Sequence, residues 1–190
     1  MMSTGKVITV AELKESLKSK LRAWEYIIIH HSQTRDKKIL SDFEAIKNYH
    51  MSYRLNGDVI TKEQADSLVA QGKTVIVPWK DIAYHYVIEY KDDKLVLREA
   101  RDMDTSGAHC SGMNGKAIGI CIVGDYDVTE PVDEQINLLS DTCLALMTAY
   151  NIPVEKIKPH HFYAPWKSCP GNKFPWMKFA KNIIDKNYLA

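Results

Sequence analysis

Apolar and polar positions along the chain follow two periods, one typical of helices and one typical of strands. An apolar residue at every third or fourth position predicts amphipathic helices over 9–24, 41–54, 61–73, 132–150 and 172–188. Short β-branched or alternating runs predict strands over 26–31, 83–90, 94–100 and 117–124. Capping-box pairs mark the starts of two of the helices, Ser41 with Glu44 and Thr61 with Gln64.

Strands interleaved with helices predict an α/β fold, a single domain with a central mixed β-sheet flanked by helices. A chain of 190 residues is long enough for one such core. We expect residues 1–24 to form a helical extension ahead of the main domain over 25–190. The segment 57–81 is long for a connection between a helix and a hairpin, so it forms either a wall beside a binding groove or a surface excursion without a role.

Composition is that of an ordinary soluble globular protein, with 45% hydrophobic and 26% charged residues. No apolar run is long enough to span a bilayer, and the polar, lysine-rich start of the chain is unlike a secretory signal. Residues 117–155 carry seven acids and no Lys or Arg, whereas residues 156–190 carry seven lysines and one acid. This basic end favours approach to an anionic polymer, although an unevenly charged solvated surface explains it equally well.

Four cysteines show no CxxC pair and no regular spacing, which argues against a disulfide scaffold or a zinc finger. Cys121 lies within an apolar strand and Cys143 on an apolar helix face, so both are expected to pack in the core. The pattern around Cys110 indicates neither packing nor chemistry. Cys169 lies in a segment that also contains two histidines.

The segment "PHHFYAPWKSCPG", residues 159–171, brings imidazoles and a thiol close together in sequence. His161 and Cys169 are eight residues apart, so a loop can place both on one zinc ion, which accepts such nitrogen and sulfur ligands. A third ligand would come from the histidine pair at 30 and 31, which ends a predicted buried strand. Two histidines and a cysteine leave a fourth position open, as in catalytic zinc sites. Each signal alone is weak, because a strand-end histidine is usually a polar contact and "CPG" is often only a turn.

Several motifs occur in the order in which a known family has them: "IIIHHSQT", "AYHYVIEY", "GAHCSG", "IGICIVGDYD" and "HFYAPWKSCPG". Over residues 26–176 the chain resembles the zinc-dependent N-acetylmuramoyl-L-alanine amidases, the group of bacteriophage T7 lysozyme and the peptidoglycan recognition proteins. The resemblance implies Zn²⁺ as cofactor, with His30, His161 and Cys169 as its ligands. His160 is the adjacent alternative to His161. His31 would then point to the other face of its strand and support the site.

The resemblance also implies roles for residues that do not bind the metal. Tyr84 and Lys167 match a tyrosine and a lysine that T7-like members place near zinc, where a phenol and an ammonium can stabilise an oxyanion. His109, in "GAHCSG", matches a loop that borders the substrate groove, so we expect it to contact substrate. His85 and His50 are expected to be structural. Without the metal motif, Tyr84 would be read as a core aromatic and Lys167 as a surface lysine.

The implied function is hydrolysis of the amide bond between N-acetylmuramic acid and L-alanine in peptidoglycan, by a phage or prophage endolysin. Such a protein is made in the cytoplasm without a signal peptide and reaches the wall through a holin or on lysis. We expect a monomer with a peptidoglycan substrate and neither a nucleic-acid nor a membrane partner. The alternatives are a cytosolic muropeptide-recycling amidase, a cysteine peptidase that uses Cys169 and His161, and a non-catalytic muropeptide-binding module.

Overall fold

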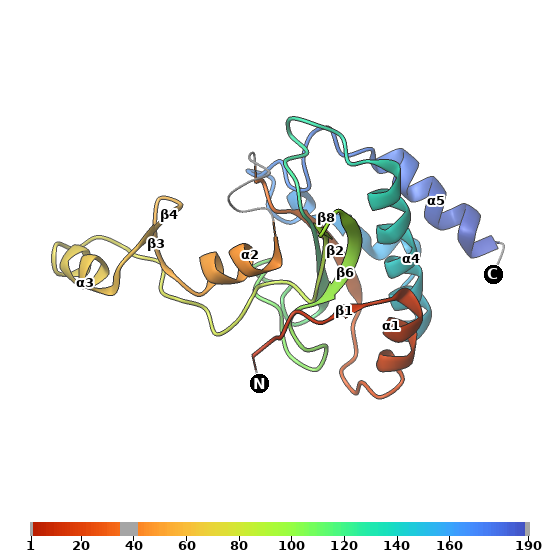
Figure 1. Ribbon diagram of the computed structural model, residues 1–190, viewed down its shortest axis with the longest axis horizontal. Coiled ribbons are helices and arrows are strands. Elements are labelled where there is room, and N and C mark those ends of the chain that lie inside the picture. Colours follow the sequence, from red (N-terminus) through yellow and green to blue (C-terminus); the bar gives the residue numbers. More distant parts are fainter. Residues whose placement is uncertain (1, 35–41, 189–190) are drawn as a thin grey trace.

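A six-stranded mixed sheet with the strand order β1–β6–β5–β7–β2–β8 runs through the middle of the protein (Figure 1). Its strands are β1 (Val7–Ile8), β2 (Tyr26–His31), β5 (Tyr86–Lys91), β6 (Lys94–Glu99), β7 (Ala117–Ile122) and β8 (Ile157–Pro159). β5, β7, β2 and β8 are parallel to one another, and β6 and β1 continue the sheet in antiparallel pairing. The computed structural model describes residues 2–34 and 42–188. The predicted α/β fold with a central mixed sheet is confirmed.

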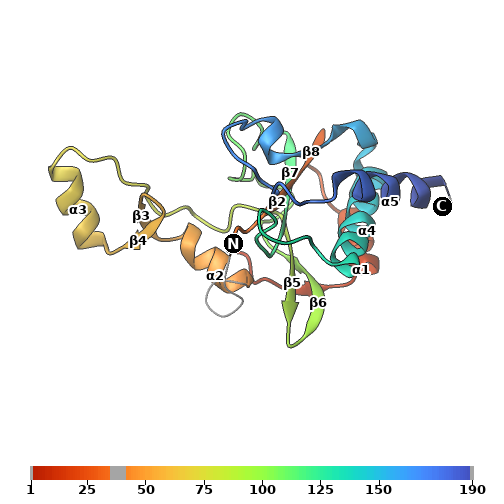
Figure 2. The same ribbon diagram turned by 90° about the horizontal axis from the view of Figure 1, so that it is seen from above.

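Helices cover both faces of this sheet, which explains why its central strands are apolar throughout. The helices are α1 (Val10–Leu17), α2 (Phe43–His50), α3 (Lys62–Ala70), α4 (Asp133–Tyr150) and α5 (Trp176–Tyr188), with short 3-10 helices η1 (Val154–Lys156) and η2 (His160–Phe162). α1, α4 and α5 pack together on one side, and α2 lies on the other (Figures 1 and 2). Every residue of β7 is buried, as a strand enclosed on both faces requires.

Local signals in the sequence locate most element ends correctly. The hairpin of β5 and β6 turns at Asp92 and Asp93, whose φ angles of 50° and 59° suit a tight hairpin turn. The capping box of Thr61 and Gln64 is present at the start of α3. The corresponding Ser41 lies outside the described residues, and Asp42 is the N-cap of α2.

The first helix is shorter than the apolar pattern predicts, because it ends at Leu17 rather than Trp24. The backbone N–H groups of Leu21 and Arg22 donate to Asp104, at 2.9 and 3.0 Å, instead of continuing the helix. Leu21, which follows Leu13 and Leu17 at helical spacing in the sequence, is 93% exposed. The segment 1–24 also supplies β1, which pairs with β6, so it packs as part of the same domain.

Residues 53–77 form an arm that projects away from the sheet beyond α2 (Figures 1 and 2). It consists of the two-stranded sheet of β3 (Tyr53–Leu55) and β4 (Asp58–Ile60), followed by α3. The two ends of the arm are joined at its base, where Arg54 and Ile76 exchange both backbone hydrogen bonds at 2.9 Å. In the described part of the chain, no helix has the length and apolar character needed to cross a membrane.

Candidate active site

The register of two parallel strands brings two histidines together at one edge of the sheet. β2 and β8 pair so that Ile29 lies opposite Pro159. The next residues are His30, in β2, and His160, the first residue of η2, and their ring centroids are 4.4 Å apart. Parallel strands end at the same edge of a sheet, where α/β proteins generally place their sites.

A loop held by Asp127 delivers the third side chain of the cluster, Cys169. The carboxylate of Asp127 accepts hydrogen bonds from the Ser168 hydroxyl at 2.6 Å and the Asn172 backbone N–H at 2.9 Å. Gly171 lets the loop pass close to the backbone of Tyr126, because a Cβ at position 171 would lie 2.3 Å from the Tyr126 carbonyl carbon. The loop is therefore held on both sides of Cys169.

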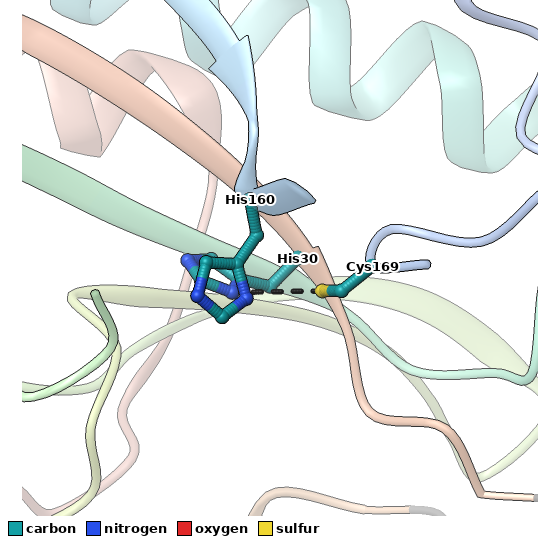
Figure 3. A group of neighbouring side chains, drawn as sticks. All are labelled: His30, His160 and Cys169. Carbon is teal, nitrogen blue, oxygen red and sulfur yellow. Dashed lines mark hydrogen bonds between the residues drawn. The ribbon is translucent and has the colours of Figure 1, made fainter. Parts of the chain in front are cut away.

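His30, His160 and Cys169 form a buried cluster whose donor atoms all lie within 4.8 Å of one another (Figure 3). The Sγ atom of Cys169 is 3.6 Å from Nδ1 of His30. The structure places His160, the adjacent alternative, beside these two residues, whereas the predicted ligand His161 lies outside the cluster. His161 is exposed, and its ring lies near the Cys169 carbonyl oxygen, with Nδ1 at 3.2 Å.

A chain of hydrogen bonds behind His30 fixes which ring nitrogen faces the cluster. Nε2 of His109 lies 3.1 Å from the carbonyl oxygen of Ala117, so this nitrogen carries the proton and donates. Nδ1 of His109 is then an acceptor, and it lies 2.9 Å from Nε2 of His30. Nε2 of His30 must donate to it, which leaves the lone pair of His30 Nδ1 pointing toward Cys169.

His109 therefore supports a member of the cluster from behind, and it also lines the cavity in front of it. It is 7% exposed. The predicted contact between His109 and substrate stays a prediction, whereas its contact with His30 is direct.

His31 points away from this cluster, as the alternation of side chains along a strand requires. Its ring lies with the carboxylates of Asp125 and Asp127, and its Nδ1 accepts a hydrogen bond from the Tyr126 backbone N–H at 3.2 Å. Its own backbone N–H donates to Sγ of Cys169 at 3.4 Å. His31 thus contacts the cysteine through its backbone rather than its ring.

Burial sets the protonation of the cluster. It lowers the pKa of His30 well below the ordinary value, with further lowering by neighbouring His109 and His160, and it lowers the pKa of His160 to about 4. Both imidazoles are therefore neutral near pH 7, with lone pairs available to a metal. Burial raises the pKa of the Cys169 thiol to about 12, although the His31 N–H and the charge of Lys167 act in the opposite direction.

The cluster lies in a cavity of about 990 Å³ that also contains Tyr84 and Lys167. The Tyr84 ring is 5.0 Å from the His30 ring, and burial raises its pKa well above the ordinary value, so the phenol keeps its proton and can donate it in a hydrogen bond. Lys167 is exposed at the rim. The arm forms part of the wall through Arg54 and Ile76, whereas α3 does not reach the cavity. No Asp or Glu lines the cavity among residues 2–34 and 42–188.

The other predicted structural histidines are buried and hydrogen-bonded. Nδ1 of His85 accepts from the Gly119 N–H at 3.0 Å, and its Nε2 lies 3.2 Å from the Thr105 carbonyl oxygen. Nδ1 of His50 accepts from the Ala83 N–H at 3.2 Å, and its ring stacks on Trp79. His50 lines the cavity as well.

The fold and the cluster define a class of protein, a mixed α/β domain with a two-histidine, one-cysteine site open to a groove. The comparisons with known proteins identify the family. Residues 20–172 match the family described as N-acetylmuramoyl-L-alanine amidase, and the chain belongs to this family. The predicted family, and with it the predicted class of enzyme acting on the cell wall, is confirmed.

Phage endolysins are among the relatives of this chain. The endolysin of Enterobacteria phage K11 is 32% identical over 111 residues, which are 55% of this chain and 70% of that protein. The endolysin of Escherichia phage T7 is 34% identical over 97 residues, which are 48% of this chain and 60% of that protein. The chain thus spans less than two thirds of the T7 protein.

A solved structure shares the fold at lower identity. The endolysin amidase LysCS from Clostridium intestinale superposes with a TM-score of 0.60 at 22% identity, over 85% of this chain and 84% of that one. At this identity the likeness concerns the fold.

Proposed function

We propose that His30, His160 and Cys169 hold a catalytic zinc ion with which this protein hydrolyses the bond between N-acetylmuramic acid and L-alanine. The observation that carries this proposal is the convergence of three buried donor atoms within 4.8 Å beside an open cavity. Tetrahedral zinc, with bonds of about 2.0–2.1 Å to nitrogen and 2.3 Å to sulfur, separates its donors by about 3.5 Å. The 3.6 Å between His30 Nδ1 and Cys169 Sγ suits this spacing.

When bound, zinc supplies a Lewis acid that polarises the scissile carbonyl and lowers the pKa of a water molecule to about 7. The residues of the chain supply the rest of the chemistry. Tyr84 donates its phenolic hydrogen to the developing oxyanion, and the Lys167 ammonium adds positive charge beside it. Either of these two side chains can also pass a proton to the leaving amine. His109 orients His30, and Asp127 holds the loop of Cys169.

A cysteine-peptidase mechanism fits this site poorly. A nucleophilic cysteine needs a lowered pKa, so that its thiolate is populated near pH 7. Burial instead raises the pKa of Cys169 to about 12. A thiol in this setting loses its proton on metal binding, which favours the role of ligand.

The biological role that we propose is that of a phage or prophage endolysin, which the similarity to the endolysins of phages K11 and T7 supports. The substrate would be peptidoglycan, reached after synthesis in the cytoplasm. A basic C-terminal segment, with seven lysines against one acid after residue 155, would favour contact with an anionic wall.

Mass spectrometry of purified peptidoglycan after digestion tests this function. We expect free amino groups on L-alanine and intact glycan chains. Removal of the metal with a chelator should stop the release of these products, and added zinc should restore it. New reducing sugar ends, or cleavage between stem residues, would contradict the proposed activity.

A further inference from the structure

Arg54 lies at the base of the arm and lines the same cavity as the metal cluster. The residue is 4% exposed. Its guanidinium carbon lies 4.7 Å from the centre of the Tyr49 ring and 4.6 Å from that of Trp79. Two aromatic rings thus contact the cation and fix its position in the cavity wall.

The nitrogens of Arg54 lack the partners that a buried guanidinium requires. Nε and Nη2 are buried and have no hydrogen-bond partner in the described part of the chain. Nor does any described carboxylate lie within ion-pair distance of Arg54. Arg98 is also buried over an aromatic ring, and its Nε also lacks a hydrogen-bond partner. It differs from Arg54 in its charge environment, because Glu89 and Glu44 are each 3.4 Å from its guanidinium nitrogens.

A buried cation without an acid nearby favours an anionic ligand. Leaving a charged group desolvated and unpaired is costly, and aromatic faces provide no acceptor for its N–H groups. A carboxylate suits guanidinium best, because its two oxygens can accept two parallel N–H bonds. The cavity supplies no carboxylate of its own, and its charged lining residues, Arg54 and Lys167, are both cationic in the described chain.

The position of Arg54 relative to the cluster indicates which part of a substrate it can reach. A row of ring contacts, each about 5 Å long, leads from His30 through Tyr84, His50 and Trp79 to Arg54. Arg54 thus lies at most four such steps from the cluster. An extended peptide covers about 3.3 Å per residue, so a few residues beyond the scissile amide reach it.

We propose that Arg54 binds a free carboxylate of the peptide stem and thereby makes this enzyme selective for stems that carry one. The inference rests on the proposed amidase function and adds a specificity-determining residue to it. An amide at the same position of the stem would leave the guanidinium unpaired. Hydrogen bonds to charged groups are worth about 1.5–3 kcal/mol, which corresponds to a preference of about 10- to 100-fold for the acid.

Matched muramyl peptides test this proposal. One pair differs only in a free or amidated α-carboxyl of the D-glutamate residue, and a second pair only in a free or amidated C-terminal carboxyl. For one of the pairs, we expect the parental enzyme to prefer the acid at least 10-fold in kcat/KM, mainly through KM. Arg54→Gln should lose this preference while it hydrolyses the amidated peptide at nearly the parental rate. Arg54→Lys keeps the positive charge but loses the two parallel N–H donors of guanidinium. Its preference for the acid should lie between those of the parental enzyme and Arg54→Gln.

Arg22→Gln is the matched control, because Arg22 also lies over a tryptophan, Trp24, at 4.7 Å but does not line the cavity. It should keep the parental preference. The proposal is wrong if the parental enzyme treats acid and amide alike, or if Arg54→Gln slows both members of a pair equally, as a purely structural role predicts. If the parental enzyme hydrolyses none of the four peptides and also fails on peptidoglycan, the amidase function itself is refuted. If it digests peptidoglycan but none of the four peptides, their dissociation constants measured by calorimetry test the proposal instead. We then expect the acid to bind at least 10-fold more tightly than the matching amide.

Discussion

Replacing Gly119 with alanine should weaken zinc binding without a change in any of the three proposed ligands. Gly119 lies in β7, and a Cβ there would be 2.5 Å from Cδ2 and 2.6 Å from Cγ of His109. Ordinary contacts of a Cβ atom begin near 3.4 Å. The His109 ring would therefore have to move by about 1 Å, and its hydrogen bonds of 2.9 Å to His30 and 3.1 Å to Ala117 could not both survive.

The size of the effect follows from two contributions. Overpacking a filled core costs about 1–3 kcal/mol of stability. Loss of a hydrogen bond that orients a metal ligand weakens metal binding about 10- to 100-fold. We therefore expect Gly119→Ala to be less stable when metal-free and to bind zinc at least 10-fold more weakly.

Competition with a chromophoric chelator measures the zinc affinity, and denaturant unfolding of the metal-free protein measures the stability. Gly115→Ala is the matched control, since a Cβ there meets only Arg22, at 3.7 Å. If Gly119→Ala loses stability but binds zinc as tightly as the Gly115→Ala variant, His109 does not orient His30. The reasoning from the hydrogen-bond chain would then fail.

Three further predictions concern other residues of the site. His31→Gln should retain zinc in elemental analysis with an unchanged circular dichroism spectrum; loss of the metal would make His31 a ligand. Tyr84→Phe and Lys167→Ala should keep zinc and bind peptidoglycan, yet turn over about 100- to 1000-fold more slowly, and parental rates of wall lysis would exclude both from catalysis. Burial lowers the pKa of His50 from its ordinary 6.5 to about 3, so the unfolded chain takes up this proton first as pH falls. The free energy of unfolding of the metal-free protein should therefore fall between about pH 6.5 and 3, and in His50→Gln it should fall less steeply with pH. An equal dependence on pH in the two proteins would mean that His50 titrates normally.

Hydrophobic patterning was sufficient to predict the central strands, the hairpin and the long helix α4, because each of these elements has a continuous periodic signal. It failed for β8, whose three residues, Ile157–Pro159, include a lysine and a proline and give no apolar run. The pairing of this strand with β2 places the next residue, His160, beside His30. The choice between His160 and His161 depends on register in a sheet, and a count of residues back from Cys169 does not contain that information.

Two other features of the site depend on tertiary contacts. The support of His30 by His109 requires the loop that contains His109 to bring its ring beside His30, which no local pattern shows. Arg54 is the last residue of the segment 41–54, for which the sequence predicts only a helix. Its burial between Tyr49 and Trp79 arises because Ile76 pairs with it across the base of the arm.

Zinc content of two neighbouring variants tests most directly the claim that His30, His160 and Cys169 form the metal centre. Purified His160→Ala and His161→Ala differ by one position, so elemental analysis of both under identical conditions compares a proposed ligand with an exposed neighbour. We predict that the parental protein holds about one zinc per chain, that His161→Ala keeps it, and that His160→Ala loses most of it. Zinc lost from His161→Ala and retained by His160→Ala would contradict the account.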